Sequence, residues 1–300
     1  MLSILIPTYN FVCVPLAAEL SRQMQESDIE GEIVVMDDAS TDAAAREANA
    51  AIASIEGCRY IELPQNTGIA RIRNRLAEAA RYDFFLFLDA DVFPVTEYFL
   101  QNYIEASYMA DVVCGGLLFR TPVATDTNRT LRYKYGTRVE AQTSRQRMQN
   151  PYGEFRTLNF LISREAFFKT RFDESFSRYG HEDTLFGKQL QLNGCTIAHI
   201  DNPIYHDVPD TNDEFLEKTR KSIDNLCEHR NTLQSHVRLL SLYERLHRLH
   251  LAGAVAGIYT VICPVLLANL RSKHPSLFLL NLYKAGYLCR VMPRNAQAHL

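Results

Sequence analysis

Four short segments rich in apolar residues divide the N-terminal third of the chain, and each of them ends in a polar turn. They occupy residues 2–6, 32–36, 59–63 and 84–88. The segments between them are rich in alanine or space their apolar residues as a helix does. Short apolar runs that alternate with helices are typical of parallel strands buried on both faces. The sequence therefore predicts an α/β fold, built on a doubly wound parallel sheet.

The remaining elements are predicted from spacing and from capping residues. Helical spacing covers residues 14–25, and Ser40 or Thr41 is expected to cap an alanine-rich helix that runs to about residue 55. Gly68 opens a helix to residue 81. Further along we expect helices at 96–109, 164–169, 182–193 and 213–226, strands at 111–120, 157–163 and 195–200, and a polar excursion at 123–155. Gly194 is expected to end its helix in the left-handed conformation.

Two carboxylates follow the most apolar of the runs directly. Asp89 and Asp91, one residue apart, come straight after residues 84–88. Ligands of open α/β sheets bind at the carboxyl ends of strands, and carboxylate oxygens suit Mg²⁺ or Mn²⁺. The two acids therefore predict a metal–diphosphate site. A simple turn cap is the alternative, and this stretch alone leaves both interpretations open.

Two other strand ends bring polar groups to the same edge of the sheet. Pro7 and Tyr9 follow the first strand and Asp38 follows the second. Neighbouring parallel strands lie about 4.8 Å apart, so these groups and Asp91 are expected to line one crevice. A tyrosine for stacking, an acid able to accept an N–H from a pyrimidine base, and a metal are what a nucleoside diphosphate requires.

The chain has no glycine-rich phosphate loop of either common pattern. The diphosphate of such a ligand must therefore be neutralised by a metal and by arginine. Arg71 and Arg73, near the start of their helix, are the candidates. A solvated helix face is the alternative for both.

A second group of chemically active residues is Gly180-His181-Glu182-Asp183. The helix dipole favours the ionised form of acids in a first turn, which suits a catalytic base. Gly180, without a side chain, is expected to let an acceptor approach. Ordinary first-turn acids are the alternative. His206 follows a later strand, and we expect it either to complete a metal site with Asp91 or to be structural.

Charge and cysteine content bear on partners and compartment. The net charge of −3 argues against a nucleic-acid binder, yet residues 233–300 contain eight Lys or Arg and one acid, Glu244. Residues 251–270 carry no formal charge, and 277–292 form a second apolar segment. We expect helices that lie on an anionic membrane surface, with a true span or an ordinary helical bundle as alternatives. Seven scattered cysteines and an N-terminus without a signal sequence favour the cytoplasm.

The order of these motifs resembles that of the family 2 glycosyltransferases, whose GT-A fold implies a doubly wound sheet that is mixed but mostly parallel. The resemblance covers about residues 1–210. The segment 179–187 is also similar to the G-x-E-D segment of chondroitin-polymerase-type and β-1,4-galactosyltransferase-like enzymes. The motifs that carry the resemblance are Pro7-Thr8-Tyr9-Asn10, Asp37-Asp38-Ala39-Ser40-Thr41-Asp42, Asn66-Thr67-Gly68 with Arg73-Asn74, Asp89-Ala90-Asp91 and Gly180-His181-Glu182-Asp183.

The resemblance implies a role for each candidate. Asp91 and His206 would bind Mn²⁺ or Mg²⁺, Asp183 would deprotonate the acceptor hydroxyl, and Glu182 would hold a hydroxyl of donor or acceptor. The donor-binding residues would be Pro7, Tyr9, Asp38, Asn66, Arg71, Arg73 and Asp89. In this scheme Tyr9 and Asp38 hold the base, and Asp89 contacts the ribose or the sugar. Of the Gly-Ala-Asn segment common in these enzymes, only Asn159 is present.

The sequence thus predicts a catalytic domain at 1–232 and a basic, apolar helical extension at 233–300. The expected activity is the metal-dependent, inverting transfer of a sugar from a nucleotide-sugar donor, and we expect a UDP-linked sugar. The expected acceptor is a glycan or a lipid-linked molecule in surface polysaccharide synthesis. The expected location is the cytoplasmic face of a cell membrane. A sugar nucleotidyltransferase and a non-catalytic membrane-bound scaffold of the same fold are the alternatives.

Overall fold

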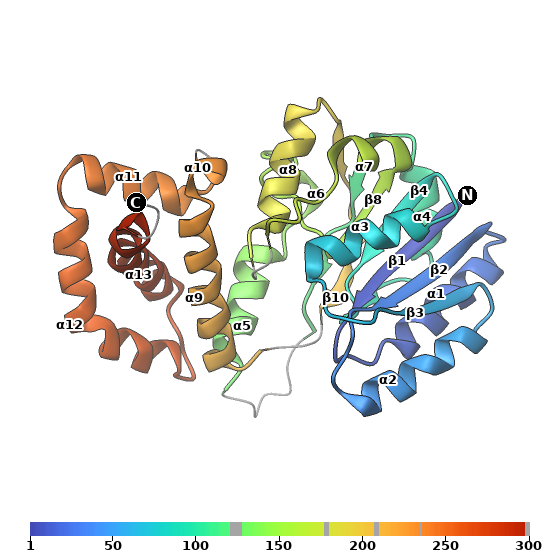
Figure 1. Cartoon of the computed structure of the whole chain (residues 1–300), viewed down its shortest axis with the longest axis horizontal. Helices are drawn as coiled ribbons and strands as arrows, with labels where there is room; N and C mark the ends of the chain where they lie inside the picture. Colours follow the sequence, from blue (N-terminus) through green and yellow to red (C-terminus); the bar gives the residue numbers. More distant parts are fainter. Residues whose placement is uncertain (121–127, 177–179, 207–209, 235, 298–300) are drawn as a thin grey trace. The chain divides into compact units, whose positions relative to one another are not determined.

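The computed structural model describes residues 1–120, 128–176, 180–206, 210–234 and 236–297 (Figure 1). The chain forms two compact units, and each is described below by itself. The first consists of Met1–Arg120, Ala141–Ser177 and Phe186–Asp207, and the second of Thr121–Glu140, Arg178–Leu185 and Val208–Leu300. The functional boundary predicted after residue 232 stays a prediction.

A seven-stranded sheet forms the centre of the first unit, with strand order β3-β2-β1-β4-β8-β6-β9. The first four strands in this order are parallel, whereas β8 runs antiparallel to both of its neighbours. This confirms the predicted mixed, mostly parallel sheet. The strands are β1 (Leu2–Thr8), β2 (Gly31–Asp37), β3 (Cys58–Glu62), β4 (Phe84–Leu88), β6 (Val112–Cys114), β8 (Asn159–Ser163) and β9 (Ile197–His199).

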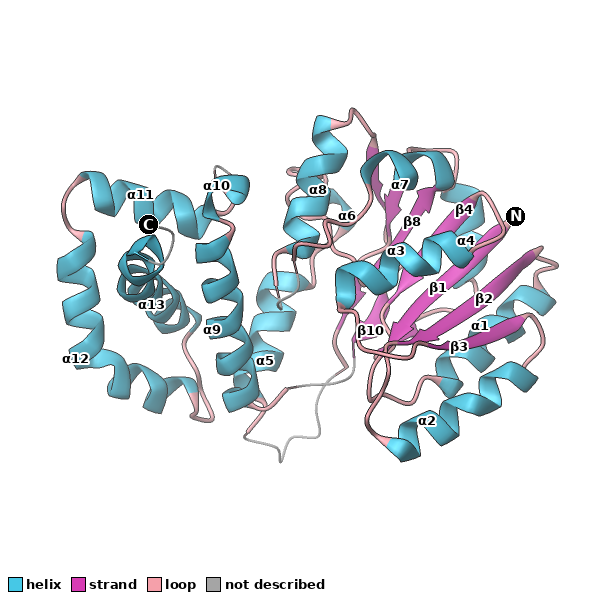
Figure 2. Ribbon diagram, in the orientation of Figure 1, coloured by secondary structure: helices cyan, strands magenta, loops and turns pink. Residues whose placement is uncertain are grey.

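Helices pack on both faces of this sheet (Figure 2), and its central strands β1, β2 and β4 are almost entirely buried, whereas the edge strand β3 is half-buried. Successive residues of one strand point to opposite faces, so Ile4 and Leu5 of β1 belong to different core clusters. The Ile4 cluster includes side chains of α1 (Val14–Glu26) and α4 (Phe99–Ala106). The Leu5 cluster includes side chains of α3 (Ile69–Ala79), α7 (Arg164–Thr170) and α8 (Glu182–Leu192).

The expectation that Ser40 or Thr41 caps the alanine-rich helix is wrong. That helix, α2 (Ala43–Ala50), begins after Asp42, whose Oδ1 accepts hydrogen bonds from the amides of Ala44 and Ala45. Ser40 is engaged elsewhere, since its amide donates to Asp37 and its hydroxyl accepts from the amide of Asn10. A short 3₁₀ turn, η1 (Ala51–Ser54), follows α2.

Three short strands that follow β4 in the sequence form a second, small sheet. Its order is β5 (Val92–Pro94), β10 (Ile204–His206) and β7 (Leu117–Leu118). Of the polar excursion predicted at 123–155, residues 123–127 lie outside the described part of the chain. The rest forms α5 (Thr130–Tyr135), a π-helical turn η2 (Gly136–Glu140) and α6 (Ser144–Arg147).

In the described part of the second unit, all regular secondary structure is helical (Figure 2). With α5 it contains α9 (Asn212–Glu228), α10 (Arg230–Leu233), α11 (Arg238–Arg248), α12 (Ala252–Leu270) and α13 (Leu277–Gln297). Its core comes from four of these helices, through Leu131, Phe215, Leu216, Tyr259, Leu266, Leu270, Leu280 and Tyr283. The predicted helical extension is therefore confirmed, and its two apolar helices take part in a bundle.

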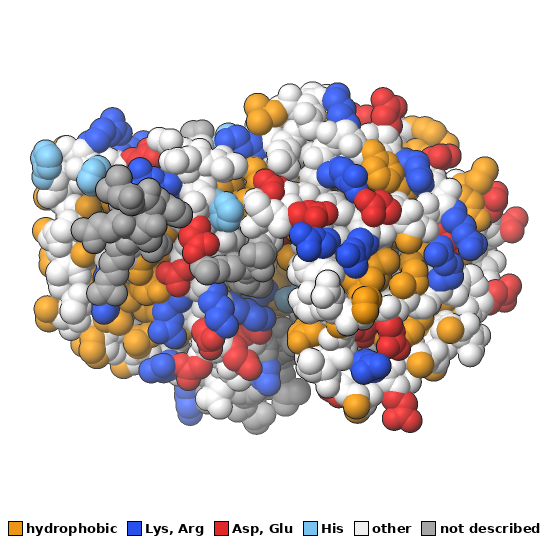
Figure 3. All heavy atoms as spheres, in the orientation of Figure 1, with side chains coloured by type: hydrophobic (Ala, Val, Ile, Leu, Met, Phe, Trp, Pro, Cys, Tyr) orange, Lys and Arg blue, Asp and Glu red, His pale blue; other side chains and the backbone are white. Residues whose placement is uncertain are grey.

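The other face of α12 is apolar and exposed. Ile258, Val261 and Val265 are 59%, 78% and 71% exposed, and Figure 3 shows hydrophobic side chains along the edge of the unit where Figure 1 draws α12. Among the helices of the described ranges, α12 alone is long and apolar enough to span a membrane. Core helices of soluble proteins can have the same length and composition.

Candidate active site

Asp91 and His206 meet because of the register of two short strands. Asp91 directly precedes β5 and His206 ends β10, and the antiparallel pairing sets His206 opposite Val92. As a result, Nε2 of His206 lies 3.2 Å from Oδ2 of Asp91. Both side chains are partly exposed, and the ring of Phe119 packs edge-on against the imidazole at 5.7 Å. A carboxylate oxygen and a ring nitrogen thus converge at an accessible position.

This pair fits a divalent cation that takes its other ligands from a substrate. No group of three or more Asp, Glu, His or Cys side chains that suits a metal occurs within the described ranges. A carboxylate with an imidazole provides two protein ligands, and Mg²⁺ or Mn²⁺ in nucleotide sites commonly completes its shell with phosphate oxygens and water. The two side chains therefore fit part of the ligand shell of Mn²⁺ or Mg²⁺.

Arg73 is buried, and it holds Asp89. Its Nη2 lies 2.8 Å from Oδ1 of Asp89, the arginine side chain is only 3% exposed, and its guanidinium lies 5.4 Å from the ring centroid of Phe172. The alternative of a solvated helix face is therefore wrong for Arg73. The ion pair fixes the Asp89 carboxylate at the end of β4, so Arg73 orients a candidate donor-binding residue.

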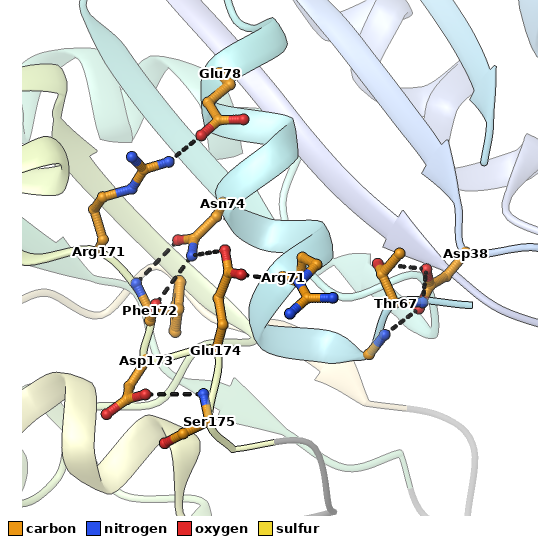
Figure 4. A network of polar contacts seen from close by, with 11 residues as sticks. Asp38, Thr67, Arg71, Asn74, Glu78, Arg171, Phe172, Asp173, Glu174 and Ser175 are labelled. Atoms are coloured by element: carbon orange, nitrogen blue, oxygen red, sulfur yellow. Dashed lines mark hydrogen bonds and ion pairs between the residues drawn. The ribbon is translucent and has the colours of Figure 1, made fainter. Parts of the chain in front are cut away.

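Arg71 has a different environment on the same helix. Its side chain is half-exposed, and its Nε donates to Oε2 of Glu174 at 2.9 Å (Figure 4). Glu174 also accepts a hydrogen bond from Asn74, and these two bonds, that of Asn74 first, lower the pKa of its carboxyl. Arg71 therefore carries an ion pair on an exposed helix face.

Asp38 joins the end of β2 to the loop before α3. Its Oδ1 accepts from the amide and the hydroxyl of Thr67, at 2.7 and 2.8 Å, and its Oδ2 accepts from the amide of Gly68 at 2.9 Å (Figure 4). Asn66 donates to the Asp38 carbonyl. A carboxylate offers about four acceptor positions, so Oδ2 retains capacity for one further donor. Asp38 is thus a loop anchor with room for one base N–H.

The loop after β1 places Tyr9 at the surface. Pro7 is buried within β1, whereas the Tyr9 side chain is 47% exposed. The backbone turns at Asn10, with φ of 54°, and Oδ1 of Asn10 accepts from the amides of Thr41 and Asp42. No role of Asn10 was predicted from the sequence. The signal was available, since Asn is among the few residues that adopt this conformation and bridge turns.

Glu182 and Asp183 lie in the first turn of α8, within the second unit. Oδ1 of Asp183 accepts from the amide of Thr184. The preceding backbone is unusual, because Gly180 and His181 have φ of +98° and +70°. Burial lowers the pKa of His181, and the charge of Asp183 opposes this in part. Tyr179, which belongs to the G-x-E-D resemblance, lies outside the described residues.

The expected room for an acceptor beside Gly180 is filled by α9. A Cβ at Gly180 would come within 2.7 Å of the Ser222 hydroxyl oxygen and 2.9 Å of its Cβ. Asn225, also on α9, donates from Nδ2 to the Gly180 carbonyl at 2.6 Å. Glycine is therefore required here by its positive φ and by the packing of α9, and the close-approach expectation is wrong on that side.

The structure brings the predicted residues together in separate groups. Within the first unit it joins Asp91 with His206, Arg73 with Asp89, and Asp38 with residues 66–68. Glu182 and Asp183 share a helix turn in the second unit. A metal-type pair, an oriented carboxylate and an anchored loop at the carboxyl ends of β4 and β2 suit a nucleoside diphosphate.

Comparisons with known proteins agree with this chemistry. Residues 3–179 match the model of glycosyl transferase family 2. A search of curated proteins finds no match for the chain.

Two solved structures share the fold. Staphylococcus aureus TarS 1–349 in complex with UDP-GlcNAc is 18% identical, with a TM-score of 0.52 over 98% of this chain and 92% of that one. The mannosyltransferase PcManGT of Pyrobaculum calidifontis, in complex with GDP-Man and Mn²⁺, is 19% identical, with a TM-score of 0.54 over 99% and 85%.

Proposed function

This chain belongs to glycosyl transferase family 2, and from that premise we propose that it transfers a sugar from a nucleoside-diphosphate donor to an acceptor hydroxyl, with inversion at the anomeric carbon. The observation that carries the proposal is the contact of Asp91 with His206 beside the end of β4. Two ligand-type side chains from distant parts of the chain converge where open α/β sheets bind their substrates.

The metal requirement rests on that pair. Asp91 and His206 would hold Mn²⁺ or Mg²⁺, and such an ion acts as a Lewis acid that stabilises a departing diphosphate. The complex of PcManGT with GDP-Man and Mn²⁺ supports the same use here. The metal would bind the neutral imidazole of His206.

The donor would be held by groups of the first unit. The exposed Tyr9 ring would stack on the base, and the remaining acceptor position of Asp38 Oδ2 would take a base N–H. Asp89, oriented by Arg73, would accept from a ribose or sugar hydroxyl. A UDP-sugar is the proposed donor, supported by the complex of TarS with UDP-GlcNAc. Asn66 would contribute through the Asp38 loop, and Pro7 by fixing the start of the Tyr9 turn.

The acceptor would be activated by the first turn of α8. From the first turn of the helix, the Asp183 carboxylate would take the proton of the acceptor hydroxyl as that oxygen attacks the anomeric carbon. Glu182 would orient a hydroxyl of donor or acceptor. The acceptor would be a glycan or a lipid-linked sugar in surface polysaccharide synthesis. The exposed apolar face of α12 and the basic residues of 233–300 would hold the enzyme at the cytoplasmic face of an anionic membrane.

Release of nucleoside diphosphate from a panel of nucleotide sugars tests the proposal. We expect turnover of one UDP-sugar with Mn²⁺ and none after chelation with EDTA. Release of pyrophosphate from a nucleotide and a sugar phosphate would favour a nucleotidyltransferase instead. Binding of the protein to membranes without turnover of any donor would favour the scaffold alternative.

A further inference from the structure

A cavity of about 650 Å³ lies within the second unit, between one wall formed by α5 and η2 and another formed by the turn after α12. Its volume is in the range of ligand-binding pockets. The second wall lies beyond residue 179, where the family match ends, so the cavity is not a feature that defines the family. The lining residues are Arg129, Thr130, Tyr133, Lys134, Thr137, Arg138, Lys273, His274 and Pro275.

Local structure explains why this wall forms. Residues 130, 133–134 and 137–138 recur at helical spacing and so share one face of α5 and η2. The opposite face of α5 is anchored in the core through Leu131, which is fully buried, and Tyr135, which packs on Phe215. The cavity face is therefore held toward the turn by the packing of the helix behind it.

Two hydrogen bonds tie the turn to this face. Oγ1 of Thr130 donates to the carbonyl of Ser272 at 2.8 Å, and Nζ of Lys134 donates to the carbonyl of Pro275 at 2.7 Å. The two carbonyls that accept these bonds belong to the residues on either side of Lys273 and His274. The bonds therefore hold the turn at a fixed distance from α5. An ammonium group has three donors, and Lys134 retains two after this bond.

The cavity is strongly basic. Arg129, Lys134, Arg138 and Lys273 line it, and its described lining includes no Asp or Glu. Arginines just outside differ, because Arg132 pairs with Glu140 and Arg271 with Asp213. Among the residues that the structure describes, Arg138 and Lys273 form no ion pair. Cations gathered in a concave site repel one another and concentrate an anion that enters it.

We propose that this cavity binds a phosphate group of the acceptor. Guanidinium and ammonium groups at fixed spacing are the side chains that recognise phosphate oxygens, through charge-assisted hydrogen bonds. The hydroxyls of Tyr133 and Thr137 add neutral donors to the same lining. The inference deepens the proposed function: the acceptor is a phosphate-bearing molecule, either a phosphorylated glycan or a lipid with a phosphate headgroup. The diphosphate of the donor is assigned to the first unit and is a separate ligand.

Binding of two probes by the full-length protein tests this. The first is inorganic tripolyphosphate, titrated calorimetrically in EDTA so that a metal-dependent donor site is silent. The second is vesicles of phosphatidylglycerol and phosphatidylcholine, compared with phosphatidylcholine alone in a flotation assay. The cavity variant is Arg138→Gln/Lys273→Gln. The matched control is Arg220→Gln/Arg230→Gln, which removes the same charge from exposed positions of α9 and α10 in the same unit, outside the basic segment 233–300.

We expect the cavity variant to lose about tenfold or more in affinity for at least one probe, and the control to stay within about twofold of wild type. Loss for tripolyphosphate alone identifies a soluble phosphorylated acceptor, and loss for vesicles alone identifies a lipid headgroup. Loss for both identifies recognition of phosphate from either source. Unchanged affinity of the cavity variant, or equal loss in the control, overturns the proposal.

The same variants separate this inference from the proposed function. Hydrolysis of the donor without acceptor requires only the donor site, so the cavity variant is expected to retain it. Failure of wild type to hydrolyse any nucleotide sugar would contradict the proposed function and leave the binding result intact. Retained hydrolysis with unchanged probe binding would contradict the cavity proposal alone.

Discussion

Nε2 of His206 lies 3.2 Å from Oδ2 of Asp91, although the two residues are far apart in the chain. The contact follows from one antiparallel pairing, in which β10 returns beside β5 and sets His206 opposite Val92. A shift of one residue in this pairing would turn His206 to the other face of the small sheet. The register of two three-residue strands therefore determines whether this chain has a second candidate metal ligand.

Asp91→Asn and His206→Gln test the metal pair. Each change removes one protein ligand and leaves the strand pairing in place, so we expect donor turnover to fall about a hundredfold or more, with a weaker response to Mn²⁺. Rates measured across a Mn²⁺ titration check this. Asp28→Asn, an exposed turn position with φ of 50° where Asn fits, is the control and should keep the wild-type rate. Normal Mn²⁺ dependence in both variants would contradict the assignment.

Asp183→Asn tests the catalytic base. The amide has the same shape and cannot take a proton, so transfer to an acceptor should fall about a hundredfold to ten-thousandfold. Because the donor is bound by other residues, its dissociation constant measured by calorimetry should stay near the wild-type value. A variant that lost donor affinity and kept its maximal rate would show that Asp183 binds the donor instead.

Asp38→Asn and Tyr9→Ala separate an anchor from an exposed contact. Asp38 accepts three hydrogen bonds from residues 67–68, and an amide in its place turns a donor toward at least one of them. We expect a loss of about 1–3 kcal/mol in the free energy of unfolding, measured in urea. Tyr9→Ala should leave stability within about 0.5 kcal/mol. It should weaken UDP binding about tenfold if the ring stacks on the base.

Gly180→Ala and Gly194→Ala test the packing of α9. Both positions have positive φ, +98° and +70°, but a Cβ at Gly194 meets no atom within 4 Å, whereas one at Gly180 collides with Ser222. Gly194→Ala should cost about 1 kcal/mol of stability, and Gly180→Ala about 1 kcal/mol more. Thermal denaturation of the two variants provides the comparison. Equal losses would mean that α9 yields to the added methyl group.

Stability should fall as the pH drops from 7.5 to 5.5. His199 is buried, its Nδ1 accepts from Nε of Arg147, and its Nε2 lies 3.0 Å from the Pro151 carbonyl. Burial, with a smaller contribution from the Arg147 charge, lowers its pKa, against the effect of the Pro151 hydrogen bond. The unfolded chain then binds a proton below about pH 6.5 that the folded chain resists, so folding weakens there.

The variant His199→Asn keeps a side-chain acceptor near Arg147 and removes the titrating ring. Its melting temperature should depend less on pH than that of wild type over this range, measured by circular dichroism. Burial lowers the pKa of His181 as well, so part of the slope should remain. A variant slope as steep as that of wild type would show that other groups control the dependence.

The local pattern of the sequence was enough for the sheet and for the acids at its strand ends. Residues 84–88 contain only apolar side chains, and a strand of that kind is stable only when both faces are covered. The acids that follow then lie at the carboxyl edge of the sheet, because they come directly after one of its strands. The apolar segments 251–270 and 277–292 were long enough to be predicted as helices, and the structure has α12 and α13 there.

Tertiary structure decided the partners of these side chains. Arg71 and Arg73 are two positions apart on one helix and looked alike in the sequence. Because they lie on different sides of that helix, Arg73 is buried and pairs with Asp89, whereas Arg71 is half-exposed and pairs with Glu174. Likewise, the space beside Gly180 is filled by Ser222 of α9, a helix that begins more than thirty residues later, at Asn212. The sequence by itself determined which elements form, because propensity and periodicity are local. Which side chains meet depended on the packing of distant elements, which only the folded chain defines.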